Sequence, residues 1–162
     1  MAVEIERKFL VTSDAWRGQV RHSALLRQGY LANTERCSVR VRLADGAGWL
    51  SVKAMTPGIA RAEYEVPIDP GDAAAMLDTL CAGPLVEKRR HLVPGEGGEW
   101  EIDEFLGDNA GLVVAEIELP AEDAPFGRPA WLGREVTAEL RYYNFRLADE
   151  PYNRWPAGWR AS

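Results

Sequence analysis

Alternation of apolar and charged residues dominates the chain and begins at its N-terminus. In VEIERKFLV, residues 3–11, the odd positions are apolar except for Arg7, and the even positions carry Glu4, Glu6 and Lys8 before Leu10. Because successive side chains of a β-strand point to opposite faces, this period of two predicts a strand with one apolar and one charged face. Similar segments recur, most of them separated by Gly, Pro, Asn or Asp. Eight strands are predicted in all, at residues 3–11, 24–32, 37–44, 49–55, 60–68, 85–93, 99–106 and 111–119.

Helical patterns are few. The segment 69–83 predicts one helix, N-capped by Asp or Gly and ended by Gly-Pro. A short capped turn is expected at 13–16, and a second helix at 137–148 with Thr137 as its N-cap. The Pro- and Trp-rich end of the chain, from about residue 150 to 162, is expected to be irregular and frayed.

The connections between strands favour one class of fold. The sequence DGAG at 45–48 is typical of a hairpin turn between two strands. Eight mainly antiparallel strands with short turns and few helices favour a closed β-barrel or a sandwich in the mainly β (α+β) class. The helices would then pack outside the strands or against an open end.

Composition and charge limit the roles that such a domain can have. The 162 residues suit a single domain spanning 1–162, and the formal net charge of −6 argues against bulk attraction to nucleic acid or to anionic membranes. Cys37 and Cys81 fit no metal-ligand spacing and are expected to be reduced structural thiols. No apolar run reaches the ~20 residues that span a bilayer, and the chain opens on a charged strand rather than a signal peptide. A cytoplasmic protein is therefore expected, and the sequence leaves a homodimer open.

The polar faces of the predicted strands carry almost nothing but ionisable groups. Most of these strands carry their charged residues as a pair or triple with a spacing of two. Basic and acidic residues tend to lie on different strands. Arg40, Arg42 and Lys53 share one hairpin, whereas Glu116 and Glu118 share the last strand. The acids of the set are Glu4, Glu6, Glu63, Glu65, Glu101, Asp103, Glu116 and Glu118. The bases of the set are Lys8, Arg40, Arg42, Lys53, Lys88 and Arg90.

Two structures could present these charges. An open sheet would expose them to water, but a solvated face usually also contains Thr, Ser, Gln and Asn, and its ion pairs contribute only about a few tenths of a kcal/mol each. A closed barrel would enclose them, and clusters of like sign would then be costly unless a ligand neutralised them. Arg and Lys clusters suit phosphate oxygens, and carboxylate clusters suit hard cations such as Mg²⁺ or Mn²⁺. The pattern therefore indicates metal-assisted phosphoryl transfer on a polyphosphate.

The segment EIERKFLV contains the Glu-x-Glu-x-Lys signature of the CYTH superfamily, also called triphosphate tunnel metalloenzymes. The chain resembles this family over nearly its whole length, since the signature is followed in order by SVRVR, LSVK, AEYEV, EKRR, WEIDEF, AEIEL and WLGREVTAELRYYN. It looks most like the small bacterial inorganic triphosphatases of that family. The resemblance implies an eight-stranded antiparallel β-barrel that forms a tunnel, a triphosphate-bearing substrate, and dependence on Mg²⁺ or Mn²⁺.

The resemblance also implies a role for each matching residue. Metal would be held by Glu4, Glu6, Glu116 and Glu118. Phosphate groups would be bound by Arg40, Arg42, Lys53, Lys88 and Arg90. A second metal or a positioned water would involve Glu63, Glu65 and Asp103, with Glu101 beside them. Arg134 and Arg141 resemble residues that approach one mouth of the tunnel.

Lys8 resembles the base that helps to activate the attacking water. An unperturbed lysine has a pKa of ~10.4, so it is protonated at neutral pH and cannot accept a proton. Burial and neighbouring cations lower the pKa of a lysine, whereas Glu4, Glu6 and phosphate would raise it. An alkaline activity optimum is therefore expected if Lys8 is the base.

The leading hypothesis is a metal-dependent hydrolase that releases orthophosphate from a short polyphosphate, with inorganic triphosphate as the first candidate. The expected partner is thus a small molecule rather than nucleic acid or membrane. A class IV adenylate cyclase and a hydrolase of thiamine or nucleoside triphosphates stay open, because the sequence neither shows nor excludes a nucleobase pocket. A non-catalytic polyphosphate sensor would keep the bases and could lose the acids, but here the acid pairs and Lys8 are all present.

Overall fold

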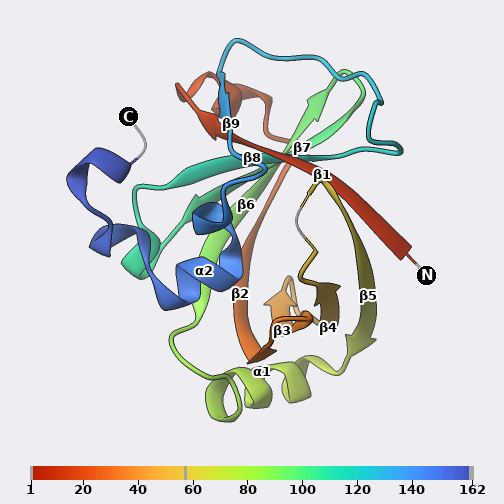
Figure 1. Ribbon diagram of the computed structural model, residues 1–162, viewed down its shortest axis with the longest axis vertical. Helices are drawn as coiled ribbons and strands as arrows, with labels where there is room; N and C mark the ends of the chain where they lie inside the picture. Colours follow the sequence, from red (N-terminus) through yellow and green to blue (C-terminus); the bar gives the residue numbers. More distant parts are fainter. Residues whose placement is uncertain (1, 57, 161–162) are drawn as a thin grey trace.

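The computed structural model describes residues 2–56 and 58–160, and β-strands are the main element of this part of the chain (Figure 1). All eight predicted strands are confirmed, with small shifts at their ends. The strands within the described residues are β1 (Ala2–Val11), β2 (His22–Asn33), β3 (Cys37–Ala44), β4 (Ala47–Ala54), β5 (Ala60–Ile68), β6 (Val86–Gly95), β7 (Gly98–Phe105), β8 (Val113–Glu118) and β9 (Leu132–Glu135).

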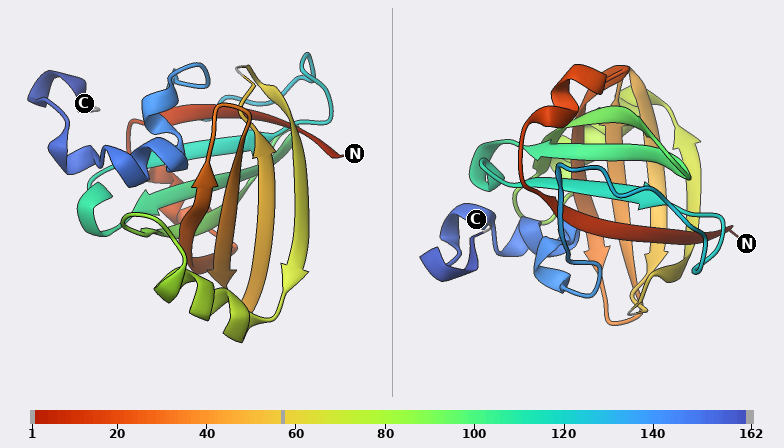
Figure 2. Two further views of the ribbon diagram at one scale, coloured as in Figure 1. Left: turned by 60° about the horizontal axis from the view of Figure 1, so that its bottom comes forward. Right: turned by 90° about the horizontal axis from the view of Figure 1, so that it is seen from above.

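The first eight strands close into an antiparallel barrel. Their order is β5-β4-β3-β2-β6-β7-β8-β1, and an additional pairing between β1 and β5 joins the two ends of the sheet. Strand β1 pairs with β5 along Ala2–Ile5 and with β8 along Glu6–Leu10. Figure 2 shows β1 crossing the ends of the curved sheet that it closes. The closed barrel is confirmed, and the alternative of a sandwich is wrong.

Strand β9 is a ninth strand that the sequence did not predict. It pairs with β1 at Phe9 and Val11, on the same edge of β1 that β5 occupies further towards the N-terminus. The strand has only four residues and contains Gly133, so it is too short to show a period of two.

The hairpin between β3 and β4 turns at Asp45 and Gly46, as predicted. Their φ angles are 50° and 73°. Positive φ at both central residues is the type I′ geometry, whose twist matches that of the flanking strands, and glycine adopts it without steric cost.

Helix α1 (Pro70–Thr79) confirms the predicted mid-chain helix, although it ends earlier than expected. The Asp69 side chain caps it by accepting hydrogen bonds from the backbone N–H groups of Gly71 and Asp72. None of the described helices is long and apolar enough to cross a membrane.

Helix α1 packs on the outer face of β3 and β4 (Figures 1 and 2). Ala73 and Leu77 are buried there in one cluster with Val41. The approach is close, because a Cβ added at Gly48 would lie 2.7 Å from the Cβ of Ala73. The outward-facing side of these strands is therefore apolar and covered, which leaves their polar side facing the interior.

A second apolar cluster covers the outside of β1, β6, β7 and β8. It unites strand residues with Trp16 of the 3-10 helix η1 (Ala15–Gln19) and with Trp131 in the segment before β9. The buried members are Phe9, Trp16, Val93, Trp100, Ile102, Ala115, Ile117, Leu119 and Trp131. The predicted turn at 13–16 thus exists as η1, and its tryptophan anchors it to the barrel.

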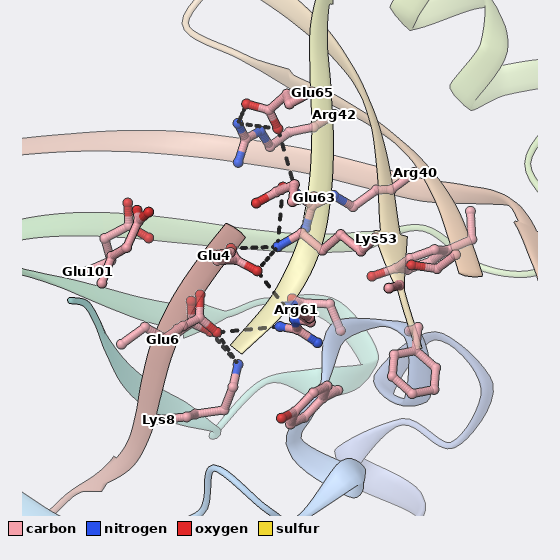
Figure 3. A pocket seen from close by; sticks show the side chains of 18 of the residues that line it. Glu4, Glu6, Lys8, Arg40, Arg42, Lys53, Arg61, Glu63, Glu65 and Glu101 are labelled. Carbon is pink, nitrogen blue, oxygen red and sulfur yellow. Dashed lines mark hydrogen bonds and ion pairs between the residues drawn. The ribbon is translucent and has the colours of Figure 1, made fainter. Parts of the chain in front are cut away.

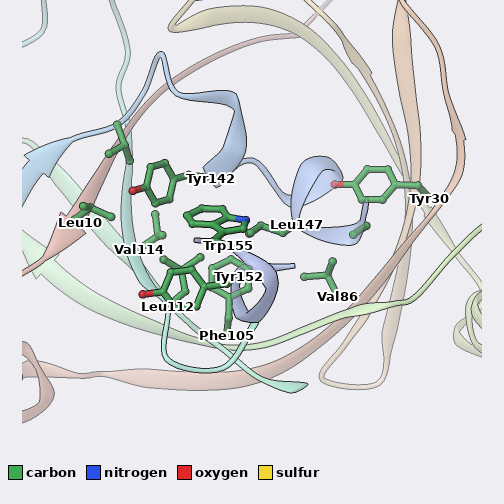
Figure 4. Packing of buried hydrophobic residues seen from close by; sticks show 12 residues of the cluster. Leu10, Tyr30, Val86, Phe105, Leu112, Val114, Tyr142, Leu147, Tyr152 and Trp155 are labelled. Carbon is green, nitrogen blue, oxygen red and sulfur yellow. The ribbon is translucent and has the colours of Figure 1, made fainter. Parts of the chain in front are cut away.

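A third cluster fills one end of the barrel (Figure 4). Leu10 and Val114, from the inner face of β1 and β8, meet Tyr142, Leu147 and Trp155 from the C-terminal part of the chain. The interior is consequently apolar at this end and polar elsewhere.

The predicted helix at 137–148 is wrong for its first half. Only α2 (Asn144–Asp149) is α-helical, preceded by the 3-10 helix η3 (Leu140–Tyr142). Thr137 is not an N-cap, because its hydroxyl accepts a hydrogen bond from the backbone N–H of Lys8 at 3.0 Å and donates one to Glu135 at 2.8 Å. The chain at Thr137 therefore completes the barrel wall beside β1 instead of starting a helix.

The expectation of a frayed tail is also wrong for its first part. Tyr152 and Trp155 are buried in the cluster at the end of the barrel. The backbone forms two 3-10 helices, η4 (Tyr152–Arg154) and η5 (Ala157–Trp159), while residues 161–162 lie outside the described part. Burial of these aromatic rings ties the tail to the fold.

Replacement of Leu77 by alanine tests the packing of α1. Leu77 is 4% exposed, so Leu77→Ala is expected to lower the free energy of unfolding by about 2–5 kcal/mol. Leu80 at the end of the same helix is 60% exposed, and Leu80→Ala should change stability by about 0.5 kcal/mol or less. Denaturant titration of both variants measures the difference, and equal effects would contradict the described packing.

Candidate active site

Strand register places the charged residues on the inner face of the barrel. Residues that pair directly across an antiparallel ladder project to the same face. Lys8 of β1 pairs with Glu116 of β8, and Glu116 pairs in turn with Glu101 of β7. Glu6 pairs with Glu118 one step along. Three neighbouring strands therefore bring four carboxylates and one ammonium group to one wall.

These side chains surround a cavity of about 240 Å³ inside the barrel (Figure 3). The predicted site residues that line it are Glu4, Glu6, Lys8, Arg40, Arg42, Lys53, Glu63, Glu65, Lys88, Arg90, Glu101, Glu116 and Glu118. The barrel thus brings together residues from seven strands that lie up to more than 100 positions apart in the sequence. This is the arrangement expected if the charged faces of the strands point inwards.

Glu4 lies between two cations. Lys53 donates to both of its carboxylate oxygens at 2.8 and 2.9 Å, and Arg61 donates to one of them at 3.2 Å (Figure 3). Burial raises the pKa of Glu4, but Lys53 and Arg61 outweigh this effect and hold the pKa at about 2. The Glu4 carboxylate is therefore ionised at any physiological pH.

Glu6 is in the opposite situation. Its nearest cations are Lys8 at 3.8 Å and Arg61 at 3.7 Å, and it faces Glu118 across the ladder. Burial and the neighbouring Glu116 carboxylate raise the pKa of Glu6 to about 7, because the opposing effect of Lys8 is smaller. Negative charge on this wall is thus incompletely balanced by the protein.

Lys8 is 3% exposed, and its ammonium group donates to Glu116 at 2.5 Å. Burial lowers the pKa of Lys8, but Glu116 and Glu6 more than offset this, so the net shift is upward. Lys8 is consequently protonated in the metal-free protein. This direction is opposite to the one that a base requires.

Asp103, for which the resemblance implies a role at a second metal or a positioned water, does not line the cavity. Its side chain is fully enclosed, and Arg90 donates to its two oxygens at 2.7 and 2.8 Å. Lys88 also donates to it, at 2.5 Å. Because both oxygens are already occupied by cations, Asp103 orients Lys88 and Arg90 instead of facing a ligand.

Lys88 joins this buried pair to the C-terminal part of the chain. Its ammonium group also donates to the side-chain oxygen of Asn144, at 3.1 Å. Burial lowers the pKa of Lys88 to about 8, despite the attraction of Asp103. The segment that starts α2 thus reaches into the cavity and holds one of its cations.

The opposite wall carries the arginine pair of β3. Arg42 donates to Glu65 at 3.2 Å, and the guanidinium of Arg40 lies 4.0 Å from the same carboxylate. Ser51 donates to Glu65 as well, at 2.6 Å. A single carboxylate therefore faces two guanidinium groups, which leaves this wall able to accept further anionic oxygens.

Arg134 and Arg141, for which the resemblance implies an approach to one mouth of the tunnel, do not line the cavity. Both pair with Glu139 near the C-terminal segment. They line a separate hollow that shares no residue with the charged cavity.

Sequence reasoning missed several lining residues. Arg61 is two positions before Glu63 and so shares the inner face of β5, and the period of two could have identified it. Tyr143, Asn144 and Phe145 also line the cavity, but no periodic signal marks them because they precede or begin α2. Their position depends on how the C-terminal segment folds back.

The carboxylates of the cavity are suitable ligands for a hard cation, but in this structure they are paired with basic side chains. Among the described residues, no three acidic, histidine or cysteine side chains converge closely enough to form a ready cation site. Carboxylate oxygens are nevertheless the ligands that Mg²⁺ and Mn²⁺ prefer, and the raised pKa of Glu6 marks negative charge that a cation would neutralise. We therefore regard the donor set as compatible with a divalent metal that replaces basic partners.

Comparison with known proteins confirms the resemblance found in the sequence. The CYTH domain family matches residues 2–152. An inorganic triphosphatase from Acetivibrio thermocellus is 49% identical over 152 residues, which cover 94% of this chain and 97% of the relative. An inorganic triphosphatase from Nitrosomonas europaea is 38% identical over 149 residues, which cover 90% and 96%. The crystal structure of the inorganic triphosphatase NE1496 has a TM-score of 0.65 at 36% identity, covering 91% of this chain and 95% of that chain.

Glutamine substitutions at Glu4 and Glu6 are expected to change stability in opposite directions. The pKa of the Glu6 carboxyl rises from 4.5 to about 7 on folding. The folded protein therefore loses stability as pH rises through that range, because the unfolded state releases this proton at a lower pH. Glu6→Gln should therefore stabilise the metal-free protein by about 3 kcal/mol above pH 7.

The pKa of Glu4 shifts in the reverse direction on folding. The stability that Glu4 contributes to the folded protein is therefore present above pH 4.5 and is lost as pH falls towards 2. Glu4→Gln should therefore destabilise the metal-free protein at pH 7.5 by about 3 kcal/mol. Thermal melts with a chelator at pH 5 and 7.5 measure both effects. Shifts of the same sign at pH 7.5 would refute the described electrostatics.

Proposed function

Because the chain belongs to the CYTH family, we propose that it hydrolyses inorganic triphosphate with a divalent metal ion and releases orthophosphate. The observation that carries this proposal is the enclosed cavity, where carboxylates and cations from seven strands surround a space of about 240 Å³. Its lining is mostly charged, which suits a small, highly charged ligand better than a nucleotide. The activity of the two relatives named above supports the same choice.

Five cations bind the phosphate groups in this proposal. They are Arg40, Arg42, Lys53, Lys88 and Arg90. Guanidinium groups fit phosphate oxygens as a bidentate fork, and the two ammonium groups act as point charges. Arg42 and Lys53 each have a carboxylate of the cavity wall within 3.5 Å, so substrate binding exchanges these carboxylate oxygens for phosphate oxygens. Lys88 and Arg90 keep their pairing with Asp103 and bind phosphate through their remaining N–H groups.

Glu4, Glu6, Glu116 and Glu118 hold the metal, which we expect to be Mg²⁺ or Mn²⁺ because their ligands are carboxylate oxygens. When bound, it would neutralise charge on the phosphates and acidify a water molecule. Release of Lys53 from Glu4 by the substrate frees one of these carboxylates. Glu63, Glu65 and Glu101 remain for a second metal or for positioning water.

Lys8 takes the proton of the attacking water in this proposal, although it is protonated in the metal-free protein. The two groups that raise the pKa of Lys8 are Glu116 and Glu6, both of which belong to the proposed metal ligands. A cation on these carboxylates would cancel their effect and leave burial and Arg61, which lower the pKa. The basicity of Lys8 is therefore tied to metal occupancy.

We also propose that the enzyme acts in the cytoplasm on a free small molecule, without binding nucleic acid. Cys37 and Cys81 are both free thiols, which suits a reducing compartment. A homodimer stays a prediction.

Phosphate release from inorganic triphosphate, ATP, thiamine triphosphate and long polyphosphate tests the proposed activity. With saturating Mg²⁺ or Mn²⁺, triphosphate should be cleaved fastest, and Glu4→Gln/Glu6→Gln should lower turnover by about 100-fold or more. The control Glu35→Gln/Glu99→Gln removes two exposed acids and should keep full activity. Binding of triphosphate without cleavage of any substrate would refute hydrolysis and favour a sensor, whereas cyclic AMP formation from ATP would indicate a cyclase.

The pH profile tests the role of Lys8. With metal saturating, the rate should rise from pH 6 to an alkaline optimum as Lys8 loses its proton. Lys8→Arg keeps the charge but cannot act as a base, so it should bind triphosphate and lose turnover. A flat profile from pH 6 to 10, or an active Lys8→Arg enzyme, would exclude Lys8 as the base.

A further inference from the structure

A second cavity of about 310 Å³ lies outside the barrel, between the end of β1, the start of β8, strand β9 and the C-terminal segment. Its lining residues are Leu10, Val11, Thr12, Gly111, Val113, Gly133, Arg134, Arg141, Tyr142, Gly158, Trp159 and Arg160. None of them lines the charged cavity of the barrel. Leu10 and Tyr142 also belong to the apolar cluster that fills this end of the barrel (Figure 4), so the outer cavity lies against that cluster.

Among the described residues, those that line this outer cavity carry positive charge, although the protein has a net charge of −6. Three arginines line it, and Glu139 is the acid that pairs with two of them. Arg160 instead donates to the backbone carbonyl of Asn153 at 2.6 Å. Two of the three guanidinium groups thus share one carboxylate, and the third is bound to a backbone oxygen.

Aromatic rings hold Arg141 in place. Its guanidinium carbon lies 5.0 Å from the ring centre of Tyr142, 5.4 Å from that of Trp155 and 5.5 Å from that of Trp159. Such stacking fixes a planar guanidinium and leaves its edge for hydrogen bonds. A pre-oriented arginine loses little side-chain entropy when it binds an anion.

Two polar atoms of this cavity have no hydrogen-bond partner within the described part of the chain. They are Nε of Arg141 and the hydroxyl of Tyr142, which lies beside the Arg134 guanidinium, and both atoms are shielded from solvent. Tyr142 is 1% exposed. Leaving a buried donor unpaired costs about 1–3 kcal/mol, so a bound group with several acceptor oxygens would be favoured here.

We propose that the outer cavity is a second binding site for a phosphate-type oxyanion. Several guanidinium forks around one centre match a tetrahedral anion, which offers more acceptor oxygens than a carboxylate. The occupant is orthophosphate or the end of a short polyphosphate, which share this chemistry. Binding here is independent of the proposed catalysis, because the two sites have no lining residue in common.

Calorimetric titration of orthophosphate into metal-free protein tests this site. The variant Arg40→Ala/Arg42→Ala weakens binding inside the barrel and should still bind phosphate. Adding Arg134→Ala/Arg160→Ala, two exposed positions, should weaken that remaining binding at least about 10-fold. The charge-matched control Arg21→Ala/Arg36→Ala also removes two exposed arginines, neither of which lines either cavity, and should leave binding unchanged.

In the otherwise unchanged protein, Arg134→Ala/Arg160→Ala should keep triphosphate turnover, which shows that the fold is intact. Sulfate should bind like orthophosphate, and acetate should bind more weakly. A triphosphate titration that displaces orthophosphate from the outer site would identify the polyphosphate end as an occupant. Loss of all phosphate binding in Arg40→Ala/Arg42→Ala, an equal effect of the control variant, or equal binding of acetate would overturn the proposal.

Discussion

The double pairing of β1 closes the barrel and thereby encloses the charged face of the sheet. One edge of β1 meets β8, and the other meets β5 along Ala2–Ile5, so a sheet with one charged face becomes a barrel with a charged interior. Enclosure of so many ionisable groups is costly unless each finds a partner. The protein meets this requirement by pairing acids with bases across strands, as in Glu4 with Lys53 and Lys8 with Glu116.

The ion pairs of this network stabilise the folded barrel, and ligands can replace the partners within them. Glu4 is held by two cations, whereas Glu6, two positions along the same strand, keeps a raised pKa because its attractions are weaker than its burial and its acidic neighbour. A bound triphosphate would replace the carboxylates that pair with the bases, and a bound cation would replace the bases that pair with the carboxylates. Neither exchange would leave a charge unpaired. The site therefore gives up some stability in the free protein in return for affinity towards both ligands.

Period-two alternation predicted most of this arrangement, because one strand face is one wall of the cavity. It could also have identified Arg61, two positions before Glu63. It failed for β9, which is too short to show a period, and at Thr137, whose hydroxyl pairs with the backbone of β1 instead of capping a helix. Asp103 has the right spacing for the cavity, yet Lys88 and Arg90 enclose it, a tertiary feature that spacing cannot show. The outer position of Arg134 and Arg141 likewise depends on how the C-terminal segment packs.

Metal and triphosphate are expected to meet inside the barrel, between the carboxylates of β1 and β8 and the cations of the other strands. Crystals of the protein grown with Mn²⁺ and a methylene-bridged triphosphate analogue would test it most directly. Anomalous manganese density is expected within coordination distance of the Glu4, Glu6, Glu116 and Glu118 group, with the analogue on Arg40 and Arg42. Manganese or analogue bound only outside the barrel would contradict it.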